Sequence, residues 1–243
     1  MSQKQYYYLL ELPENIYLSP SYLFRWWDGV IKFNGPVAAL YDQSEEFKKG
    51  RELWVAAMFA AGKRRLTGKE HWVRAVKDSA PDAIVAYMKR DKDGYGELKY
   101  SLEVTTYGKH SDNIEEVLKA KLDKHYASYT RILCYISDRP KGELIEPTKI
   151  SDFVSKNNAN GYEVWLLSSV GGKIYVGKNL YRLLCLTQKE DVTFDYDEVK
   201  NTQNISDAFK LTGRGYSRSG LIENFGQIQL NFPRKDESGE LRK

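Results

Sequence analysis

Two carboxylates in the middle of the chain are the residues whose types and spacing best suit a chemical task. Asp82 follows Pro81 at the start of an apolar run, and Glu103 lies 21 positions later, inside LeuGluValThrThr. An unpaired charge is costly to bury in such a run, so Glu103 needs a cation or a water-lined cleft beside it. Mg²⁺ binds one or two carboxylates together with waters and a backbone carbonyl, here that of Val104, and such sites commonly serve phosphodiester hydrolysis.

The elements around these carboxylates are predicted to bring them together. Apolar, β-branched and aromatic runs predict strands over 82–88 and 98–107, and AspGly within 89–96 predicts the hairpin turn between them. Because the strands of a hairpin pair side by side, Asp82 and Glu103 can converge. They can share one ion only if their carboxylates lie within about 8 Å of each other, since each Mg²⁺ to oxygen distance is about 2.1 Å.

A longer pattern of helices and strands surrounds this hairpin. Ser44 as an N-cap, apolar residues at helical spacing and a terminal Gly62 predict a helix over 44–62. The order is helix, three strands, helix, strand, helix, strand. It predicts an α/β fold in which a mixed β-sheet is flanked by helices. The other predicted strands are 71–76, 130–136 and 163–170, and the other predicted helices are 111–126 and 149–157.

The order of elements and the carboxylates together resemble the PD-(D/E)xK nuclease superfamily, over about 45–170. The residues that carry the resemblance are Glu52 on the first helix, ProAsp at 81–82 and GluValThr at 103–105. The resemblance implies a restriction-endonuclease-like core with N- and C-terminal additions. It also implies that Asp82 and Glu103 are ligands of Mg²⁺ or Mn²⁺, and that Glu52 supports the metal from its outer coordination shell.

Thr105 occupies the position of the superfamily's lysine, and it has no charge to polarise a water or stabilise a developing phosphorane oxygen. In a first interpretation the lysine comes from elsewhere, as in superfamily members where it has moved to the following helix. Lys121 lies near the sheet-facing side of the predicted helix 111–126, whose other lysines point further outward, and Lys109 lies in the loop before it. In a second interpretation an ion-bound hydroxide suffices without lysine. In a third the protein is inactive and retains the fold for binding or assembly.

Each candidate residue also has an ordinary structural explanation. Asp82 after a proline suits a turn. Glu52 could pair with a lysine on its own helix, and Lys121 taken alone would be a surface charge. Glu103 has the weakest explanation of this kind, because only a Lys or Arg from a neighbouring strand would satisfy it.

The chain divides by composition into three segments. Residues 1–44 are rich in aromatic and turn-forming residues and predict an N-terminal arm or subdomain of short strands and loops, in which at least one of Trp26 and Trp27 packs in the core. Residues 45–172 form the nuclease-like core. Residues 173–243 form a C-terminal extension with a basic, glycine-rich loop, packed with the core as one domain.

Composition narrows the class of protein. The 243 residues are 42% hydrophobic and 29% charged, as in soluble globular proteins, and a net charge of +4 does not by itself indicate a polyanionic partner. No stretch reaches the roughly 18 apolar residues of a membrane span, and no signal-peptide pattern is present, so we expect no membrane and a cytoplasmic location. Cys134 and Cys185 lie in apolar runs, which predicts buried thiols rather than a disulfide or zinc site.

Two basic loops are the predicted nucleic-acid contacts. The loops at 63–69 and 212–220 combine cations with glycines, and the second adds a tyrosine that could stack on a base. A solvated charged loop is the ordinary explanation for each alone, and no helix-turn-helix or zinc-finger spacing is visible. The predicted contact residues are Lys63, Arg64, Arg65, Arg214, Tyr216 and Arg218.

These features predict a Mg²⁺-dependent endonuclease that hydrolyses phosphodiester bonds of DNA rather than RNA, and the resemblance implies a setting in restriction, defence or a mobile element. One alternative is a catalytically inactive nucleic-acid-binding or assembly protein on the same fold. Another is an interaction module in which the aromatic segment 6–27 forms oligomers, since a homodimer is the usual way in which this fold encircles duplex DNA.

Overall fold

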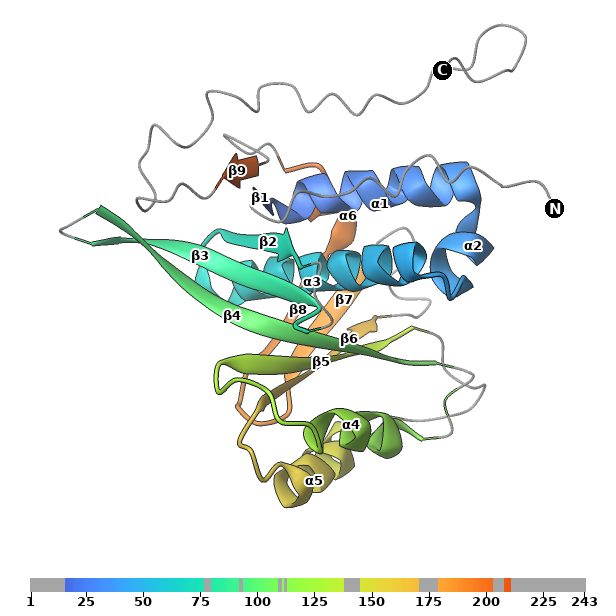
Figure 1. Ribbon diagram of the computed structural model, residues 1–243, viewed down its shortest axis with the longest axis vertical. Helices are drawn as coiled ribbons and strands as arrows, with labels where there is room; N and C mark the ends of the chain where they lie inside the picture. The colour runs from blue at the N-terminus through green and yellow to red at the C-terminus, as the bar shows by residue number, and fades with distance from the viewer. Residues whose placement is uncertain are drawn as a thin grey trace, which may run out of the picture.

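The computed structural model describes residues 16–76, 80–91, 94–108, 111, 113–137, 145–170, 179–202 and 208–210, with the side chains of 88–91, 94–97 and 208–210 left out. Its centre is one nine-stranded sheet in the order β8-β7-β6-β5-β4-β3-β2-β1-β9 (Figure 1). The strands are β1 (Ile16–Leu18), β2 (His71–Ala75), β3 (Ala83–Asp91), β4 (Gly94–Tyr107), β5 (Thr130–Ile136), β6 (Glu163–Ser169), β7 (Leu180–Cys185), β8 (Asp191–Asp195) and β9 (Ala208–Lys210).

The sheet is mixed, as the sequence predicts. Three consecutive strands, β4, β5 and β6, run parallel, and every other neighbouring pair is antiparallel. Parallel neighbours need crossover connections, which the helices α4 (Ile114–Leu122) and α5 (Pro147–Asn157) provide. Both helices cover one face of the sheet, and the long helix α3 (Glu45–Thr67) covers the other (Figure 1).

The two faces of the sheet have separate apolar cores. One core joins α3 and the helix α1 (Pro20–Asn34) to residues of β4 that include Leu102 and Val104. The other joins α4 and α5 to residues that include Tyr107 and Ile132. Successive residues of a strand point to opposite faces, so these cores also fix which way Glu103 points.

Helix α3 is longer than predicted. The prediction of an end at Gly62 is wrong: the helix continues to Thr67 and ends at Gly68, whose φ of 67° is the left-handed conformation that favours glycine. Gly62 serves close packing instead, since a Cβ atom there would lie 2.5 Å from Leu183 Cδ2 on β7. The glycine allows the helix to approach the sheet.

The predicted short strands and loops of the N-terminal segment are also wrong in its described part. After the three-residue strand β1 come α1 (Pro20–Asn34) and α2 (Pro36–Tyr41). Ser19 is the N-cap of α1, because its hydroxyl accepts a hydrogen bond from the backbone N–H of Tyr22 at 3.1 Å. A proline follows it at the first position of the helix. Trp26 and Trp27 are both buried, which confirms that this segment contributes to the core.

The predicted C-terminal extension supplies part of the sheet. Strands β7 and β8 pair beyond β6, and the short helix α6 (Tyr196–Lys200) packs against α1. The basic loop at 212–220 lies outside the described residues. Cys134 and Cys185 are buried free thiols, as predicted. Within the described ranges, no helix combines the length and the apolar character that a membrane crossing needs.

Candidate functional site

The candidate site lies where β3 and β4 separate. Their ladder ends with the pair Ala83 and Leu102, while β4 continues to Tyr107. Asp82 lies just before β3. Its side chain takes the place of a backbone partner for β4, because Asp82 Oδ2 accepts a hydrogen bond from the backbone N–H of Val104 at 2.7 Å. In a strand the N–H and C=O of one residue point to the same edge, so the Val104 carbonyl also faces this opening.

Glu103 points away from α3 and toward α4. It is 3% exposed, and it lies on the face of β4 opposite to Leu102 and Val104. Lys121, near the end of α4, donates a hydrogen bond from Nζ to Glu103 Oε2 at 2.9 Å. The same nitrogen lies 3.6 Å from Asp82 Oδ2.

The two predicted carboxylates therefore converge. Because Lys121 Nζ lies 2.9 Å from one carboxylate oxygen and 3.6 Å from the other, those oxygens can be at most 6.5 Å apart, the sum of the two distances. This upper bound is inside the predicted limit of about 8 Å between the carboxylates. Two oxygens bound to one Mg²⁺ lie at most about 4.2 Å apart, so a shared ion would hold these oxygens within that smaller distance. The sequence-predicted residues Asp82, Glu103 and Lys121 thus meet at one point, although they come from three different elements.

Lys121 is the lysine that the structure brings to the carboxylates. Burial lowers the pKa of its ammonium group, but the charge of Asp82 and the hydrogen bond and charge of Glu103 outweigh burial, so the pKa is raised. Lys119, on the same helix, is exposed and pairs with Asp123 at 2.8 Å. The other predicted candidate, Lys109, lies outside the described residues.

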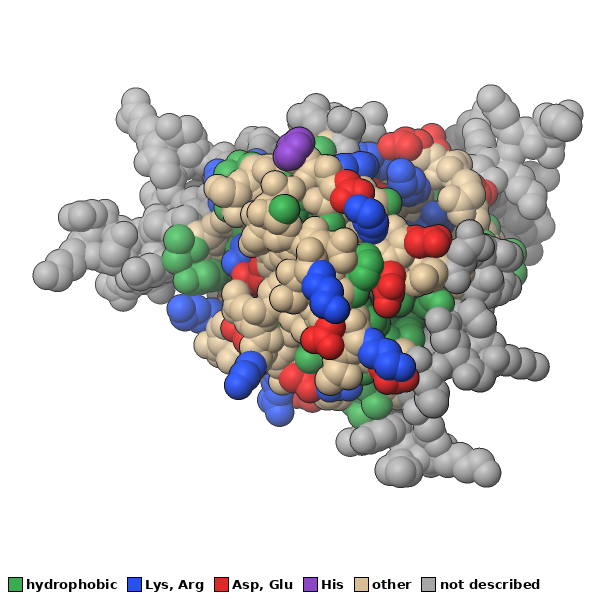
Figure 2. Space-filling view, turned by 90° about the horizontal axis from the view of Figure 1, so that it is seen from below, with side chains coloured by type: hydrophobic (Ala, Val, Ile, Leu, Met, Phe, Trp, Pro, Cys, Tyr) green, Lys and Arg blue, Asp and Glu red, His purple; other side chains and the backbone are tan. Residues whose placement is uncertain are grey.

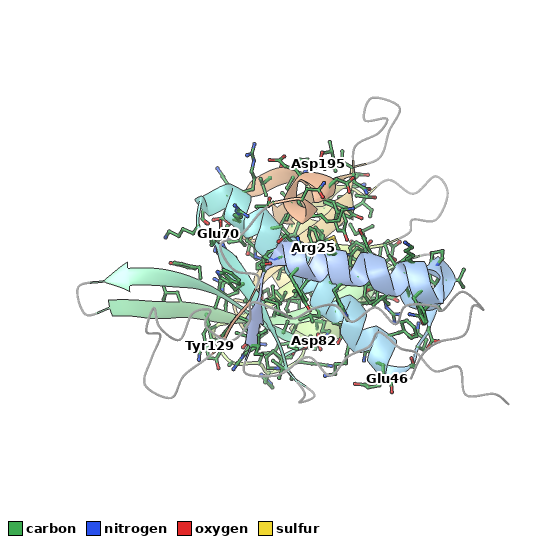
Figure 3. All side chains as sticks on the ribbon, turned by 90° about the horizontal axis from the view of Figure 1, so that it is seen from above. Arg25, Glu46, Glu70, Asp82, Tyr129 and Asp195 are labelled. Atoms are coloured by element: carbon green, nitrogen blue, oxygen red, sulfur yellow. The ribbon has the colours of Figure 1, made fainter. Side chains whose placement is uncertain are left out.

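Glu52 approaches the same opening from α3, on the other side of the sheet. Burial raises the pKa of its carboxyl group to about 7, and the negative charge of Asp82 contributes, while nearby lysines that include Lys121 act in the opposite direction. A carboxyl group with such a pKa can exchange a proton at neutral pH. Figure 3 places Asp82 along one side of the molecule, between Glu46 in the first turn of α3 and Tyr129.

Tyr126 is a member of the site that sequence reasoning missed. The predicted helix 111–126 placed it at a helix end, but α4 stops at Leu122 and the following loop turns the tyrosine toward Glu103. Burial raises the pKa of the Tyr126 hydroxyl, and the charge of Glu103 raises it further. No pattern in the sequence marks this contact, because it depends on how the loop folds back.

Glu103 also interacts with Tyr126. Its Oε1 and the Tyr126 hydroxyl are both buried, and neither makes a hydrogen bond of regular geometry among the described residues. A side-chain hydrogen bond with Glu103 nevertheless contributes to the raised pKa of Tyr126, so the two groups lie close together. A buried carboxylate oxygen with so weak a partner could also accept a cation or a water.

The donor set suits a hard cation that keeps part of its water shell. In the described ranges, no three His, Cys, Asp or Glu side chains group closely enough to hold a metal ion by themselves. Mg²⁺ does not need such a cage, since it commonly uses one or two carboxylates with waters and substrate phosphate oxygens. Asp82, Glu103 and the Val104 carbonyl supply ligands of this kind.

The predicted basic contacts are less open than their sequence suggests. Lys63 pairs with Glu190 at 2.8 Å and Arg64 with Glu70 at 2.8 Å, while Arg65 is exposed. Arg214, Tyr216 and Arg218 lie outside the described residues. On the face formed by α4 and α5, basic and acidic side chains alternate, so this face is not a broad basic surface for a phosphate backbone (Figure 2).

Comparisons with known proteins add no relative: no protein-family model matches the chain, and neither curated proteins nor solved structures give a significant match.

Proposed function

We propose that this chain is an endonuclease that uses Mg²⁺ or Mn²⁺ to hydrolyse phosphodiester bonds of DNA. The observation that carries the proposal is the convergence of Asp82, Glu103 and Lys121, with Lys121 Nζ 2.9 Å and 3.6 Å from the two carboxylates. Two carboxylates and a lysine at the opening between two strands are the parts of a PD-(D/E)xK site. The order α3, β2, β3, β4, α4, β5 supports a restriction-endonuclease-like core.

Each side chain has a distinct task in this proposal. Asp82 and Glu103 hold the metal ion, with the Val104 carbonyl as a further ligand. A bound Mg²⁺ would stabilise negative charge on the phosphate and make a bound water more acidic. Glu52 supports the ion from the outer coordination shell.

Lys121 supplies the lysine that is absent at position 105, where the chain has Thr105. Its raised pKa keeps the ammonium group protonated at neutral pH, so it can donate hydrogen bonds to the attacking water and to the developing negative charge. The hydrogen bond of Lys121 to Glu103 positions the ammonium group beside the metal ligand rather than in the solvent.

Plasmid cleavage tests the proposal. With Mg²⁺ or Mn²⁺ we expect nicked and linear products, and chelation of the metal should abolish them. Asp82→Asn, Glu103→Gln and Lys121→Met should each lower the rate by about 100-fold or more, because each removes a charge that acts on the transition state. Lys119→Met is the matched control, since Lys119 is on the same helix and points outward.

The inactive alternative makes a different prediction for the same variants. A protein that retains the fold only for binding would associate with DNA, would not cleave it under any metal condition, and would bind equally well after Asp82→Asn or Glu103→Gln. That result would overturn the proposal.

A further inference from the structure

A pocket of about 640 Å³ opens at the edge of the sheet where β5 and β6 begin. Residues of β3 and β4 and the loops that precede β5 and β6 form its walls. Its volume is typical of sites that enclose small organic groups. Neither metal-ligand candidate lines it, so it is distinct from the carboxylate site.

Four aromatic rings contribute to the walls of this pocket. Four of its fourteen lining residues are tyrosines: Tyr87, Tyr100, Tyr129 and Tyr162. Tyr129 is 56% exposed, so its ring can receive a ligand without displacing the core. The guanidinium group of Arg131 lies 3.9 Å from the centre of the Tyr100 ring. Tyrosine rings and an arginine plane are the surfaces on which unpaired nucleobases stack.

One wall of the pocket has an unsatisfied polar group. Tyr100 is only 6% exposed, and its buried hydroxyl has no hydrogen-bond partner among the described residues. Such a hydroxyl normally finds a partner when it is buried. Because the hydroxyl has almost no accessible surface, a nucleobase in the pocket would meet the Tyr100 ring and not its hydroxyl.

The charge around the pocket suits a nucleotide. Glu163 is the only acidic residue in its lining, and this carboxylate is paired with Arg131 at 2.8 Å. Lys99 also lines the pocket, and Lys69 Nζ lies 4.6 Å from the centre of the Tyr87 ring. The lining thus has two basic residues, Lys99 and Arg131, and one acidic residue, a small excess of positive charge that favours a phosphodiester.

The pocket and the carboxylate site share one loop. The hydroxyl of Tyr162 accepts a hydrogen bond from the Tyr126 backbone N–H at 2.6 Å, and the two rings pack 5.5 Å apart. Tyr126 lies beside Glu103, so the loop that carries Tyr129 also reaches the metal ligand. Along β4, Tyr100 precedes Glu103 by three residues, or about 10 Å, and the two side chains point to opposite faces of the sheet. A DNA strand that contacts both places must therefore pass around the loop that carries Tyr126 and Tyr129.

We propose that this pocket binds an unpaired nucleobase of the DNA strand that is cleaved at Asp82 and Glu103. The preferred substrate is then single-stranded or locally opened DNA rather than an intact duplex. The inference rests on the proposed function for the nature of the ligand, and it adds the substrate class.

Binding without cleavage tests this inference. The full chain, with a chelator present, is titrated into a fluorescein-labelled oligothymidine or a duplex of the same length, and anisotropy gives the two dissociation constants. We expect tighter binding of the single strand.

Tyr129→Ala should weaken that binding by about fivefold or more, while Tyr129→Phe preserves it, because stacking needs the ring and not the hydroxyl. Duplex binding should change little. Tyr41→Ala, at an exposed tyrosine of α2, is the control.

A crosslinking experiment on the unaltered protein gives a second measurement. An oligonucleotide that contains 5-iodouracil is irradiated with the protein, and the modified peptide should contain Tyr129 or Tyr162. Crosslinks confined to other segments, or equal loss of single-strand and duplex binding in Tyr129→Ala, would overturn the inference. Cleavage that depends on Asp82 while Tyr129→Ala has no effect leaves the nuclease proposal intact. Single-strand binding that depends on Tyr129, without cleavage in any metal, contradicts the nuclease proposal instead.

Discussion

The position of the basic group is the main question at the scale of single residues. Thr105 and Glu103 lie two positions apart on β4 and therefore point to the same face of the sheet. A lysine at 105 would extend from that face, whereas the chain supplies its lysine from α4. Hairpin pairing and helical spacing were sufficient to predict that Asp82 and Glu103 converge and that Lys121 or Lys109 lies near them. They were insufficient for Tyr126, whose direction depends on a non-local loop contact.

Moving the lysine tests whether its charge or its helix matters. If the site needs only the positive charge, the double variant Thr105→Lys with Lys121→Met should cleave DNA at least tenfold faster than Lys121→Met alone. One positioned charge typically changes the rate of the chemical step by about this factor or more. Initial rates of plasmid nicking measure this. Thr106→Lys with Lys121→Met is the control, because residue 106 points to the other face. Equal rates for the two double variants would show that the lysine does not act at this point.

His71 should make stability depend on pH. Burial lowers the pKa of its imidazole to about 4, and its Nδ1 lies 2.7 Å from the carbonyl oxygen of Lys69. Because the folded pKa is below the unfolded value of about 6.5, its contribution to stability is complete above pH 6.5 and is lost as the pH falls toward 4. We expect a loss of about 2–3 kcal/mol over this range.

Urea denaturation at pH 7 and pH 4 measures this effect in His71→Gln. Other groups titrate over the same range, so the informative quantity is the difference between the pH dependence of the variant and that of the unaltered chain. The variant should be less sensitive to acid. His125→Gln, at an exposed histidine, should retain the original sensitivity, and an unchanged slope in His71→Gln would contradict the assignment.

At the scale of elements, tertiary packing determines the type and the bounds of two helices for which the sequence pattern is misleading. Strand β5 has the predicted bounds because a short, nearly continuous apolar run can hardly be placed elsewhere. Helix α1 was missed because its aromatic residues favour strands, although Leu23, Phe24, Trp27 and Val30 have helical spacing and are buried. Gly62 resembles a helix end in the sequence, because only the contact with the neighbouring β7 shows that it serves close packing.

Gly62→Ala tests the close approach of α3 to β7. In an exposed helix this change stabilises by about 1 kcal/mol, but here the added Cβ would lie 2.5 Å from Leu183 Cδ2. We therefore expect a destabilisation of about 1–3 kcal/mol. In the Leu183→Ala background the cost of Gly62→Ala should shrink or change sign, which a double-mutant cycle on unfolding free energies measures. An equal cost in both backgrounds would mean that another contact opposes the Cβ atom.

At the scale of the whole molecule, the site lies where the strand pairing in the sheet changes from antiparallel to parallel. Strands β3 and β4 are antiparallel, β4 and β5 are parallel, and α4 makes the crossover that the parallel pair requires. The crossover carries Lys121 back to Glu103, while the end of the hairpin provides Asp82. The same topology therefore builds the core and assembles the charges, so that the proposed metal binding would be linked to stability through Lys121.

That linkage predicts how a divalent metal affects unfolding. In Lys121→Met the carboxylates of Asp82 and Glu103 lose their cation, and a buried charge without a partner should lower the unfolding free energy by about 3 kcal/mol. If the proposed site binds Mg²⁺ in the folded state only, Mg²⁺ should restore stability to Lys121→Met. The rise in melting temperature should be larger than in the unaltered chain, where Lys121 competes for the same oxygens. Lys119→Met should behave like the unaltered chain, and adding Glu103→Gln to Lys121→Met should remove the response to Mg²⁺. Melting curves over a range of Mg²⁺ concentrations measure these shifts. If Mg²⁺ leaves the melting temperature of Lys121→Met unchanged, the two carboxylates do not form a metal site, and their convergence on Lys121 is a structural ion pair.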